Sequence, residues 1–191
     1  MAETIRSVDP SESSRLTEIG QLTALAYLAD GLVDQAHPYI PQLRDAHARA
    51  QEAELLILVD GEDGSGPVQG TITLVPPGSG LSELASGDEY ELRMLAVSPI
   101  ERGRGIGAKL TQAAMDLAVE RGAARVVLST MESMHVAHRL YERMGFVRRE
   151  DLDWIVLDNE DGTVDRLGPD EAQKAERLGT TIRLLGYSWE P

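Results

Sequence analysis

Cysteine is absent from the 191-residue sequence, and this absence excludes disulfide bonds, thiolate metal sites and cysteine nucleophiles. A chain without cysteine fits a reducing compartment, and we expect a cytoplasmic location. Aromatic side chains are also few, with one Phe, two Trp and five Tyr. Ala, Leu and Val must therefore fill most of the interior.

Long apolar runs are missing as well. No stretch approaches the ~20 apolar residues that span a bilayer, and the start MAETIRSVDP lacks the apolar core of a signal peptide.

Basic residues are fewer than acidic ones: the sequence has 18 Lys and Arg and 32 Asp and Glu, which gives a formal charge of −14. Such a surface repels nucleic-acid phosphates and anionic lipids, so we expect neither nucleic acid nor a membrane as a partner. It weakly favours cationic small molecules.

What the sequence does contain predicts one mixed α/β domain over residues 1–191, with a polar, irregular insert at about 158–178 that holds a short helical piece. Strands are expected where short apolar runs are bounded by turn residues, and helices where apolar residues recur at helical spacing. The expected strands are 4–8, 54–60, 68–75, 90–97, 125–129, one or two strands within 146–157, and 181–189; the expected helices run from the 11–14 caps to Gly31, and over 38–50, 106–121 and 134–144.

The segment Val97 to Ala108 (VSPIERGRGIGA) is the most informative. A strand ends, Pro99 breaks it, and Gly103, Gly105 and Gly107 lead directly into a helix. Glycines let a backbone approach a ligand, and the unpaired N–H groups of a helix start point towards an anion. A dinucleotide fingerprint fits less well, because no acidic residue ends the next strand, and a P-loop is excluded by the missing Gly-Lys-Ser/Thr. A phosphate site and a plain capped turn both stay open.

The chain contains, in order, Glu91 to Pro99 (ELRMLAVSP), Arg102 to Gly107 (RGRGIG) and Ala137 to Phe146 (AHRLYERMGF). Together these three segments resemble the GNAT superfamily of N-acetyltransferases. Arg102 to Gly107 (RGRGIG) resembles its R/Q-x-x-G-x-G/A pyrophosphate motif. Glu91 to Pro99 (ELRMLAVSP) is similar to its fourth strand, and Ala137 to Phe146 (AHRLYERMGF) to its A-x-x-L-Y-x-x-x-G-F helix. The resemblance implies a mixed, mostly antiparallel central sheet, splayed at its fourth and fifth strands and flanked by helices. It is looser before this region and poor over the last third of the chain.

The resemblance also implies acetyl-CoA as co-substrate and two segments that bind it. In the family, the pantetheine arm pairs with exposed backbone of the fourth strand, as an added strand would. Leu95, Ala96 and Val97 occupy these positions, and an N–H near Leu95 is implied to polarise the thioester carbonyl. The implied pyrophosphate site consists of the main-chain N–H groups of Arg102, Gly103, Arg104, Gly105, Ile106, Gly107 and Ala108.

Two residues are implied to be catalytic. Tyr141 holds the motif position from which a phenol protonates the departing thiolate, a contribution of ~10²–10⁴ in rate; packing of its ring is the alternative. Glu91 lies where some branches of the family carry a glutamate that deprotonates the attacking ammonium through water. A primary amine is protonated near pH 7 and must lose a proton before it attacks. A glutamate there would also suit pairing with a neighbouring Arg.

The family's acceptor pocket forms from the first helix pair, the face of the fourth strand and the last strands. Candidate substrate-binding residues are Tyr27, Tyr39, Met94, His135 and Trp154, with His135 as an alternative base. No metal site is expected, because His135 and His138 have no obvious further ligands. The run at 158–162 (DNEDG) departs from EF-hand spacing and predicts a hairpin turn.

The sequence thus predicts an acyltransferase that moves acetyl from acetyl-CoA to the primary amine of a small molecule, by direct attack in a ternary complex. Two alternatives stay open. One is a sensor or regulatory module that binds acyl-CoA without turnover, and the other is an N-acetyltransferase of proteins or peptides. The expected partners are acetyl-CoA and an amine acceptor, and a homodimer is left open.

Overall fold

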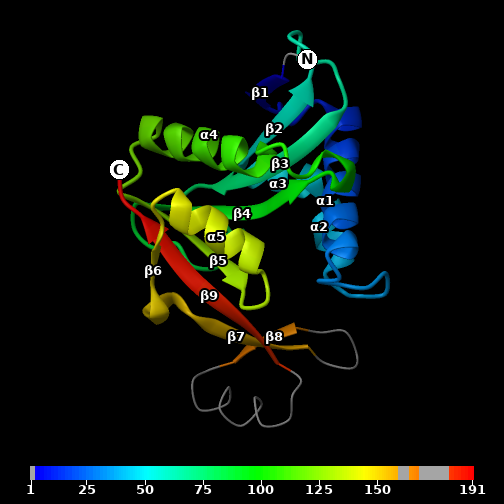
Figure 1. Ribbon diagram of the computed structural model, residues 1–191. Coiled ribbons are helices and arrows are strands. Elements are labelled where there is room, and N and C mark those ends of the chain that lie inside the picture. Colours follow the sequence, from blue (N-terminus) through cyan, green and yellow to red (C-terminus); the bar gives the residue numbers. More distant parts are fainter. Residues whose placement is uncertain (1–2, 159–163, 168–180) are drawn as a thin grey trace.

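The computed structural model describes residues 3–158, 164–167 and 181–191 (Figure 1). The strands are β1 (Glu3–Ser7), β2 (Glu54–Asp60), β3 (Val68–Val75), β4 (Glu89–Val97), β5 (Arg125–Met131), β6 (Val147–Arg148), β7 (Trp154–Asp158), β8 (Val164–Leu167) and β9 (Thr181–Trp189). The helices are α1 (Ser13–Ala29), α2 (Ile40–Arg44), α3 (Ala46–Glu52), α4 (Ile106–Glu120) and α5 (His135–Arg143), with short 3₁₀ turns at Pro99–Glu101 and Glu150–Leu152.

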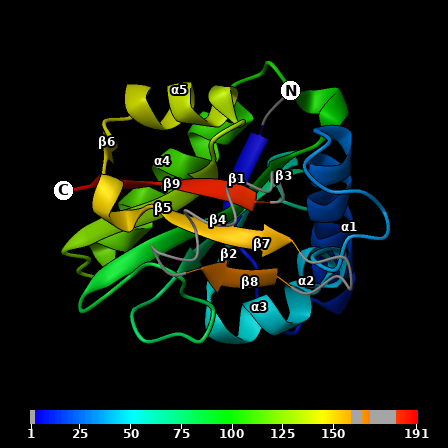
Figure 2. The same ribbon diagram turned by 90° about the horizontal axis from the view of Figure 1, so that it is seen from below.

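All of these strands belong to one sheet with the order β1-β2-β3-β4-β5-β9-β7-β8, and β6 also pairs with β9. Every pairing among them is antiparallel except that of β4 with β5. Seen from below, β7 and β8 follow β9 at one end of the sheet (Figure 2). The prediction of a mixed, mostly antiparallel sheet flanked by helices is confirmed.

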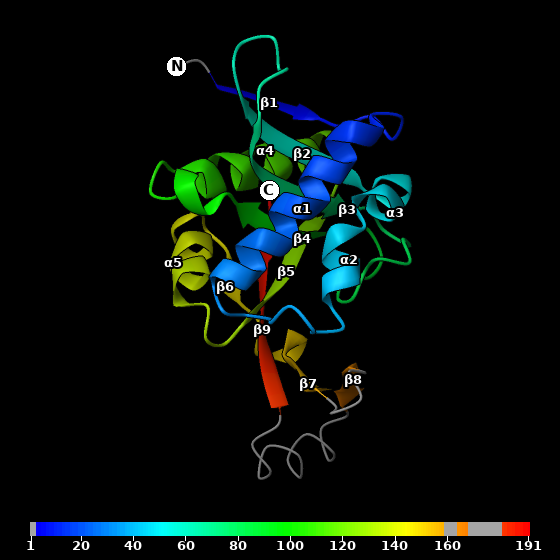
Figure 3. The ribbon, with the colours of Figure 1, turned by 90° about the vertical axis from the view of Figure 1, so that its right-hand side faces the viewer.

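Helices cover both faces of the sheet. α4 and α5 lie on one face, and α1, α2 and α3 lie on the other (Figures 1 and 3). β2 shows the sequence reason, since Leu56 and Leu58 pack into the core with Leu110 of α4, while Ile57 packs into the core with Leu16 of α1. A strand buried on both faces needs a nearly continuous apolar run, and β2 supplies one in ELLILVD.

β4 and β5 part after a short shared stretch. Their parallel pairing extends from Glu89–Arg125 to Leu92–Leu128 and no further. The carboxyl-terminal half of β4 therefore loses its neighbour on that side while β3 still pairs with it. This confirms the predicted splaying, and it leaves strand backbone open at the centre of the molecule.

A bulge marks the point where β4 leaves β5. Between the pairs Ala96–Thr71 and Arg93–Thr73, β4 holds one residue more than β3. Met94 has a positive φ of 51°, which is uncommon for a residue with a side chain. An extra residue of this kind is left out of the ladder of hydrogen bonds and bends its strand. The main-chain N–H groups around Leu95 are therefore turned away from the regular hydrogen-bond pattern between β3 and β4.

The prediction of one helix over 38–50 is wrong, because the chain breaks at Asp45. This residue has φ −84° and ψ 68°, and its carboxylate accepts a 2.9 Å hydrogen bond from the Ala48 amide as the N-cap of α3. The buried guanidinium of Arg49 donates to carbonyls of the last turn of α2, including that of Gln42 at 2.8 Å. The helical hydrogen bonds are thus interrupted at Asp45, and its side chain caps the start of α3 instead.

The predicted irregular character of the insert is wrong for β8, which pairs with β7 from Ile155–Leu167 to Asp158–Val164. The predicted turn at 158–162, apart from Asp158, and the short helical piece lie outside the described residues. Over the part of the chain that the structure describes, no helix has the length and apolar character to cross a membrane.

Candidate active site

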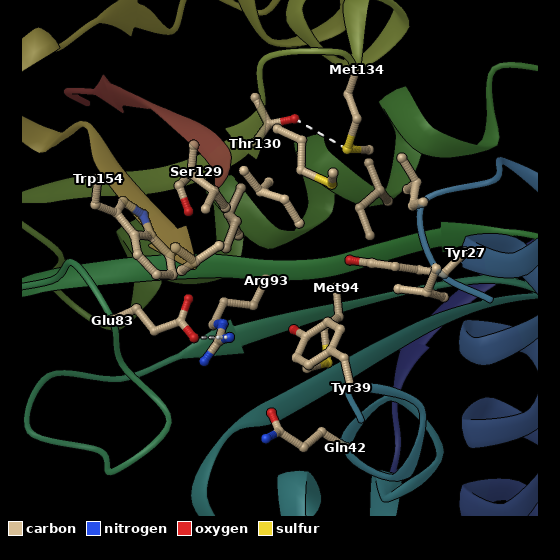
Figure 4. A pocket seen from close by; sticks show the side chains of 18 of the residues that line it. Tyr27, Tyr39, Gln42, Glu83, Arg93, Met94, Ser129, Thr130, Met134 and Trp154 are labelled. Atoms are coloured by element: carbon tan, nitrogen blue, oxygen red, sulfur yellow. Dashed lines mark hydrogen bonds and ion pairs between the residues drawn. The ribbon is translucent and has the colours of Figure 1, made fainter. Parts of the chain in front are cut away.

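A cavity of about 650 Å³ lies where β4 and β5 diverge (Figure 4). Its wall is formed by β4, β5, α5, α1, α2 and the segment between these two helices, the β3–β4 loop, and β7 to β9. It brings together most of the residues predicted for catalysis and acceptor binding: Tyr141, Glu91, Leu95, Tyr27, Tyr39, Met94 and Trp154. These residues are distributed over more than half of the sequence, and the divergence of two strands gives them a common space.

Tyr141 projects from α5 and is only 7% exposed. Its ring packs against Phe146 and against Tyr187, with centroids 5.7 and 6.5 Å away. Burial raises the pKa of the Tyr141 hydroxyl above its usual value, since a phenolate is poorly solvated in the interior. The hydroxyl therefore stays protonated at neutral pH and can serve as a proton donor.

Aromatic rings line two sides of the cavity. Tyr27 and Tyr39 lie together with centroids 6.2 Å apart, and burial raises the pKa of both phenols. Trp154 lies across the cavity from them (Figure 4). The guanidinium of Arg166 covers the Trp154 ring at 4.7 Å and donates to the main-chain carbonyl of Glu83 at 2.8 Å. β8 and the β3–β4 loop are thereby joined beside the cavity.

Glu91 lines the cavity but has only 1% exposure. Its Oε2 accepts hydrogen bonds from the Ser82 hydroxyl at 2.9 Å and from the amides of Glu83 and Leu84 at 2.8 and 2.9 Å. Its Oε1 lies 3.9 Å from Nε of Arg93. The carboxylate predicted as a base thus holds the β3–β4 loop against β4.

Glu83 and Arg93 were not among the predicted site residues, although both line the cavity. Arg93 Nη2 lies 2.6 Å from Glu83 Oε1, and the Arg93 guanidinium also donates to the Leu81 carbonyl. The sequence does contain one indication of this pair, because an arginine inside the apolar strand LRMLAV needs a buried partner. The partner itself lies in a Gly/Ser/Pro-rich loop that carries no motif.

His135 does not line the cavity, unlike the other predicted acceptor residues. It is exposed, and its ring lies edge-on to that of His138 with centroids 5.8 Å apart. His138 Nε2 is 3.0 Å from the Met131 carbonyl oxygen. Within the described ranges, no group of three or more His, Cys, Asp or Glu side chains is arranged to hold a metal ion.

The glycine segment forms the open start of α4. Gly105 is the N-cap, with φ 76° and no side chain to cap the helix. The Lys109 amide donates to the Gly105 carbonyl at 3.0 Å, so the amides of Ile106, Gly107 and Ala108 have no partner within the helix. Amides of this kind, at the positive end of a 15-residue helix, can bind a phosphate group.

Gly107 connects this helix start to β4. A Cβ at Gly107 would lie 3.6 to 3.8 Å from side-chain atoms of Leu140, Leu95 and Val97, which is an ordinary contact distance. Protein packing therefore does not require a glycine at this position. A ligand between α4 and β4 would need the space that a side chain at Gly107 would fill. The two predicted cofactor segments face one another here.

The basic side chains of the segment are already paired. Arg102 binds Asp30 at the end of α1, with Nη1–Oδ1 2.7 Å. Arg104 binds Glu3 at 2.9 Å and also pairs with Glu101. The amides of Arg102, Gly103 and Arg104 belong to the predicted pyrophosphate site, but the charge of these arginines is shared with protein carboxylates.

A mostly antiparallel sheet that is flanked by helices and splayed between β4 and β5 matches the acyl-CoA N-acyltransferase fold. The model of the Acetyltransferase (GNAT) family matches residues 21–146. The chain belongs to this family, as the three motifs predicted, and the family is one of acyltransferase enzymes.

The chain resembles characterised relatives over part of their length. It is 44% identical over 61 residues to N-alpha-acetyltransferase 30 of Schizosaccharomyces pombe, an alignment that covers 32% of this chain and 41% of that protein. It is 32% identical over 117 residues to a mycothiol acetyltransferase of Cellulomonas flavigena, covering 59% of this chain and 34% of that protein. The chain therefore spans less than half the length of these relatives.

A solved structure of a GNAT family acetyltransferase from Brucella melitensis, in complex with acetyl-CoA, has 25% identity and a TM-score of 0.56, over 76% of this chain and 83% of that one. Acetyl-CoA is the co-substrate typical of the family. The unpaired amides at the start of α4, the space at Gly107 and the open edge of β4 fit this group.

Proposed function

We propose that this chain transfers the acetyl group of acetyl-CoA to the primary amine of a small molecule, by direct attack within a ternary complex. One observation carries the proposal: the cavity in which Tyr141 and Leu95 lie also contains Tyr27, Tyr39 and Trp154. Chemistry at a thioester and recognition of an acceptor can therefore occur in one connected space. When bound, acetyl-CoA supplies an acetyl group activated as a thioester.

The chain's own residues would divide three tasks. The amides of residues 102–108 hold the diphosphate, and the exposed backbone of Leu95 to Val97 pairs with the pantetheine arm. Beside the bulge at Met94, an N–H group near Leu95 would bind the thioester carbonyl oxygen, and such a donor contributes ~10²–10³ in rate. Tyr141 then donates a proton to the departing sulfur.

The shape of the acceptor side favours a small molecule. The volume of about 650 Å³ lies within the range of ~300–1,000 Å³ usual for small-molecule sites. The hydrogen bond from Arg166 to the Glu83 carbonyl joins two walls that an open peptide groove would keep apart. The rings of Tyr27 and Tyr39 offer faces to a cation, and Trp154, whose ring Arg166 covers, adds apolar surface.

A second acceptor class, the amino terminus of a protein or peptide, is favoured by the similarity to the yeast N-alpha-acetyltransferase 30. A panel of acceptors with acetyl-CoA, followed by release of free thiol, separates the two. Small amines, polyamines, amino acids and short peptides are compared at equal concentration. Turnover with small amines is expected. Turnover with peptides alone would favour the second class, and binding of acetyl-CoA without any turnover would contradict both.

A further inference from the structure

Two carboxylates are among the described residues that line the cavity, and their oxygens are used differently. Glu91 binds the β3–β4 loop, because its Oε2 accepts hydrogen bonds from the Ser82 hydroxyl and from the amides of residues 83–85. With 1% exposure and Arg93 beside its other oxygen, it has little room for an acceptor amine. A second carboxylate must be considered for the proton transfer.

Glu83 presents its carboxylate to the cavity. About a third of its side chain is accessible, at 35%, and Figure 4 shows the carboxylate between Arg93 and Trp154. One oxygen, Oε1, accepts from Arg93 at 2.6 Å. Within the described residues no donor is bound to Oε2, so this oxygen can accept a proton or a hydrogen bond from a ligand.

β4 fixes Glu83 at two points. The Glu83 amide donates a hydrogen bond to Glu91 Oε2 at 2.8 Å, and the Arg93 guanidinium donates one to the Glu83 carboxylate. Glu91 and Arg93 are two residues apart on one strand, and side chains at this spacing point to the same side of a sheet. The sequence ELR at 91–93 therefore places an acceptor and a donor side by side, and together they orient one residue of a loop that has no regular structure.

The groups that face Glu83 determine how readily it takes a proton. Burial raises the pKa of the Glu83 carboxyl, the neighbouring Glu91 raises it further, and the cations Arg93 and Arg166 oppose the rise. The net direction is upward, and Tyr39 is a further titratable group that interacts with Glu83. A carboxylate with a raised pKa is a stronger base near neutral pH.

We propose that Glu83 is the base that deprotonates the acceptor ammonium, and that Glu91 and Arg93 position it. The proposal rests on the proposed function, in which the acceptor is a primary amine. The ammonium gives one proton to Glu83 Oε2, and the lone pair it gains forms the C–N bond to the thioester carbonyl carbon. The C–S bond breaks, and the sulfur takes the proton of Tyr141. The new amide nitrogen returns its second proton to the Tyr141 oxygen, and Glu83 releases its proton to solvent.

The test measures kcat/KM against pH for the intact chain and for Glu83→Gln, with two acceptors: an alkylamine that is protonated at pH 7 and an arylamine that is neutral there. Glu62→Gln, an exposed substitution in the β2–β3 turn, is the matched control. For the alkylamine we expect Glu83→Gln to lower kcat/KM by ~10²-fold or more and to abolish the acidic limb of the profile. For the arylamine the loss should be much smaller.

Two further variants test the positioning of Glu83 and whether another side chain of the cavity, His37, acts as the base. Arg93→Met removes a cation beside Glu83, so the acidic limb should move to higher pH. Binding of acetyl-CoA to this variant, measured by calorimetry, shows that the protein is folded.

His37 also lines the cavity, and its Nδ1 accepts a hydrogen bond from the Tyr39 amide at 3.1 Å. Loss of the acidic limb in His37→Gln instead of Glu83→Gln would overturn the proposal. An unchanged profile, or a rise in KM alone, in Glu83→Gln would also overturn it.

A wrong assignment of the base can be told apart from a wrong proposed function. If the unmodified chain transfers acetyl to no amine, the proposed function itself is wrong, and this is known before any variant is compared. If the unmodified chain is active and Glu83→Gln matches Glu62→Gln, only the assignment of the base is wrong.

Discussion

The ring of Tyr141 stands edge-on to the ring of Phe146, with 5.7 Å between the centroids and 62° between the planes. Phe146 is itself 3% exposed, and both residues belong to the main core that covers one face of the sheet. This contact fixes the direction of the phenol, while Tyr141 also lines the cavity. Packing of the ring and proton donation by the hydroxyl are therefore compatible.

Replacing Tyr141 with Phe removes the hydroxyl and keeps the ring contacts. We expect Tyr141→Phe to lower kcat by ~10²–10⁴ and to leave acetyl-CoA binding by calorimetry nearly unchanged. Tyr90→Phe, a partly buried tyrosine of β4 that does not line the cavity, is the matched control and should keep full activity. Equal activity of the two variants would show that Tyr141 only packs.

The two glycines Gly107 and Gly70 should respond in opposite ways to alanine. A Cβ at Gly107 meets nothing closer than 3.6 Å, while one at Gly70 would lie 2.7 Å from Ile106 and 2.9 Å from Leu110. Gly107→Ala should keep or raise the melting temperature and weaken acetyl-CoA binding about tenfold or more. Gly70→Ala should destabilise folding by ~1–3 kcal/mol. Calorimetry and thermal unfolding of both variants test this, and full acetyl-CoA affinity in Gly107→Ala would contradict the position assigned to the ligand.

Asp45 is expected to act on stability alone. Its carboxylate caps α3 through the Ala48 amide, and removal of such a cap typically costs about 1 kcal/mol. Asp45→Ala should therefore lower the free energy of unfolding in urea by that amount, and Asp45→Asn by less. Neither should change the KM of the acceptor, because Asp45 does not line the cavity. A KM that rises with unchanged stability would reverse this assignment.

The pair of Arg6 and Glu12 predicts a specific dependence of stability on pH. Its two hydrogen bonds, at 2.8 and 2.7 Å, lower the pKa of the Glu12 carboxyl to about 2. A carboxyl with a lowered pKa stabilises the fold above its unfolded pKa of about 4.3, and this contribution is lost as the pH falls towards 2. Because both side chains are about one third exposed, the contribution is below ~1 kcal/mol.

Unfolding in urea measures this difference. Glu12→Gln should be less stable than the unmodified protein near neutral pH, and the gap should close as the pH falls from about 4.5 towards 2. A gap of constant size across this range would contradict the lowered pKa.

Much of the fold followed from local patterns that tertiary structure did not override. Both faces of β2 are covered, and its sequence is a nearly continuous apolar run. α4 spans Ile106–Glu120, close to the helix predicted over 106–121. The break at Asp45 could not be predicted as easily, since no Gly or Pro marks it and the surrounding residues favour a helix. It depends on Arg49, which reaches back to carbonyls of α2.

The site was only partly predictable for a related reason. Tyr141 and the glycine segment belong to motifs, so their places in the sequence indicate their places in the fold. Glu83 has no such marker, because its position depends on contacts with Glu91 and Arg93 from another segment. His135 illustrates the reverse case: a chemically suitable residue at the start of α5 points to solvent, because the cavity is bounded by Met134 and Tyr141 of that region.

The proposed function requires main-chain amides at the start of α4 to hold the diphosphate of acetyl-CoA beside the divergent strands. A crystal structure of the chain with coenzyme A would show where the diphosphate binds. We expect diphosphate oxygens within about 2.7–3.2 Å of amide nitrogens between Gly103 and Ala108, with the pantetheine arm along Leu95 to Val97. A diphosphate bound at any other place on the chain would contradict it.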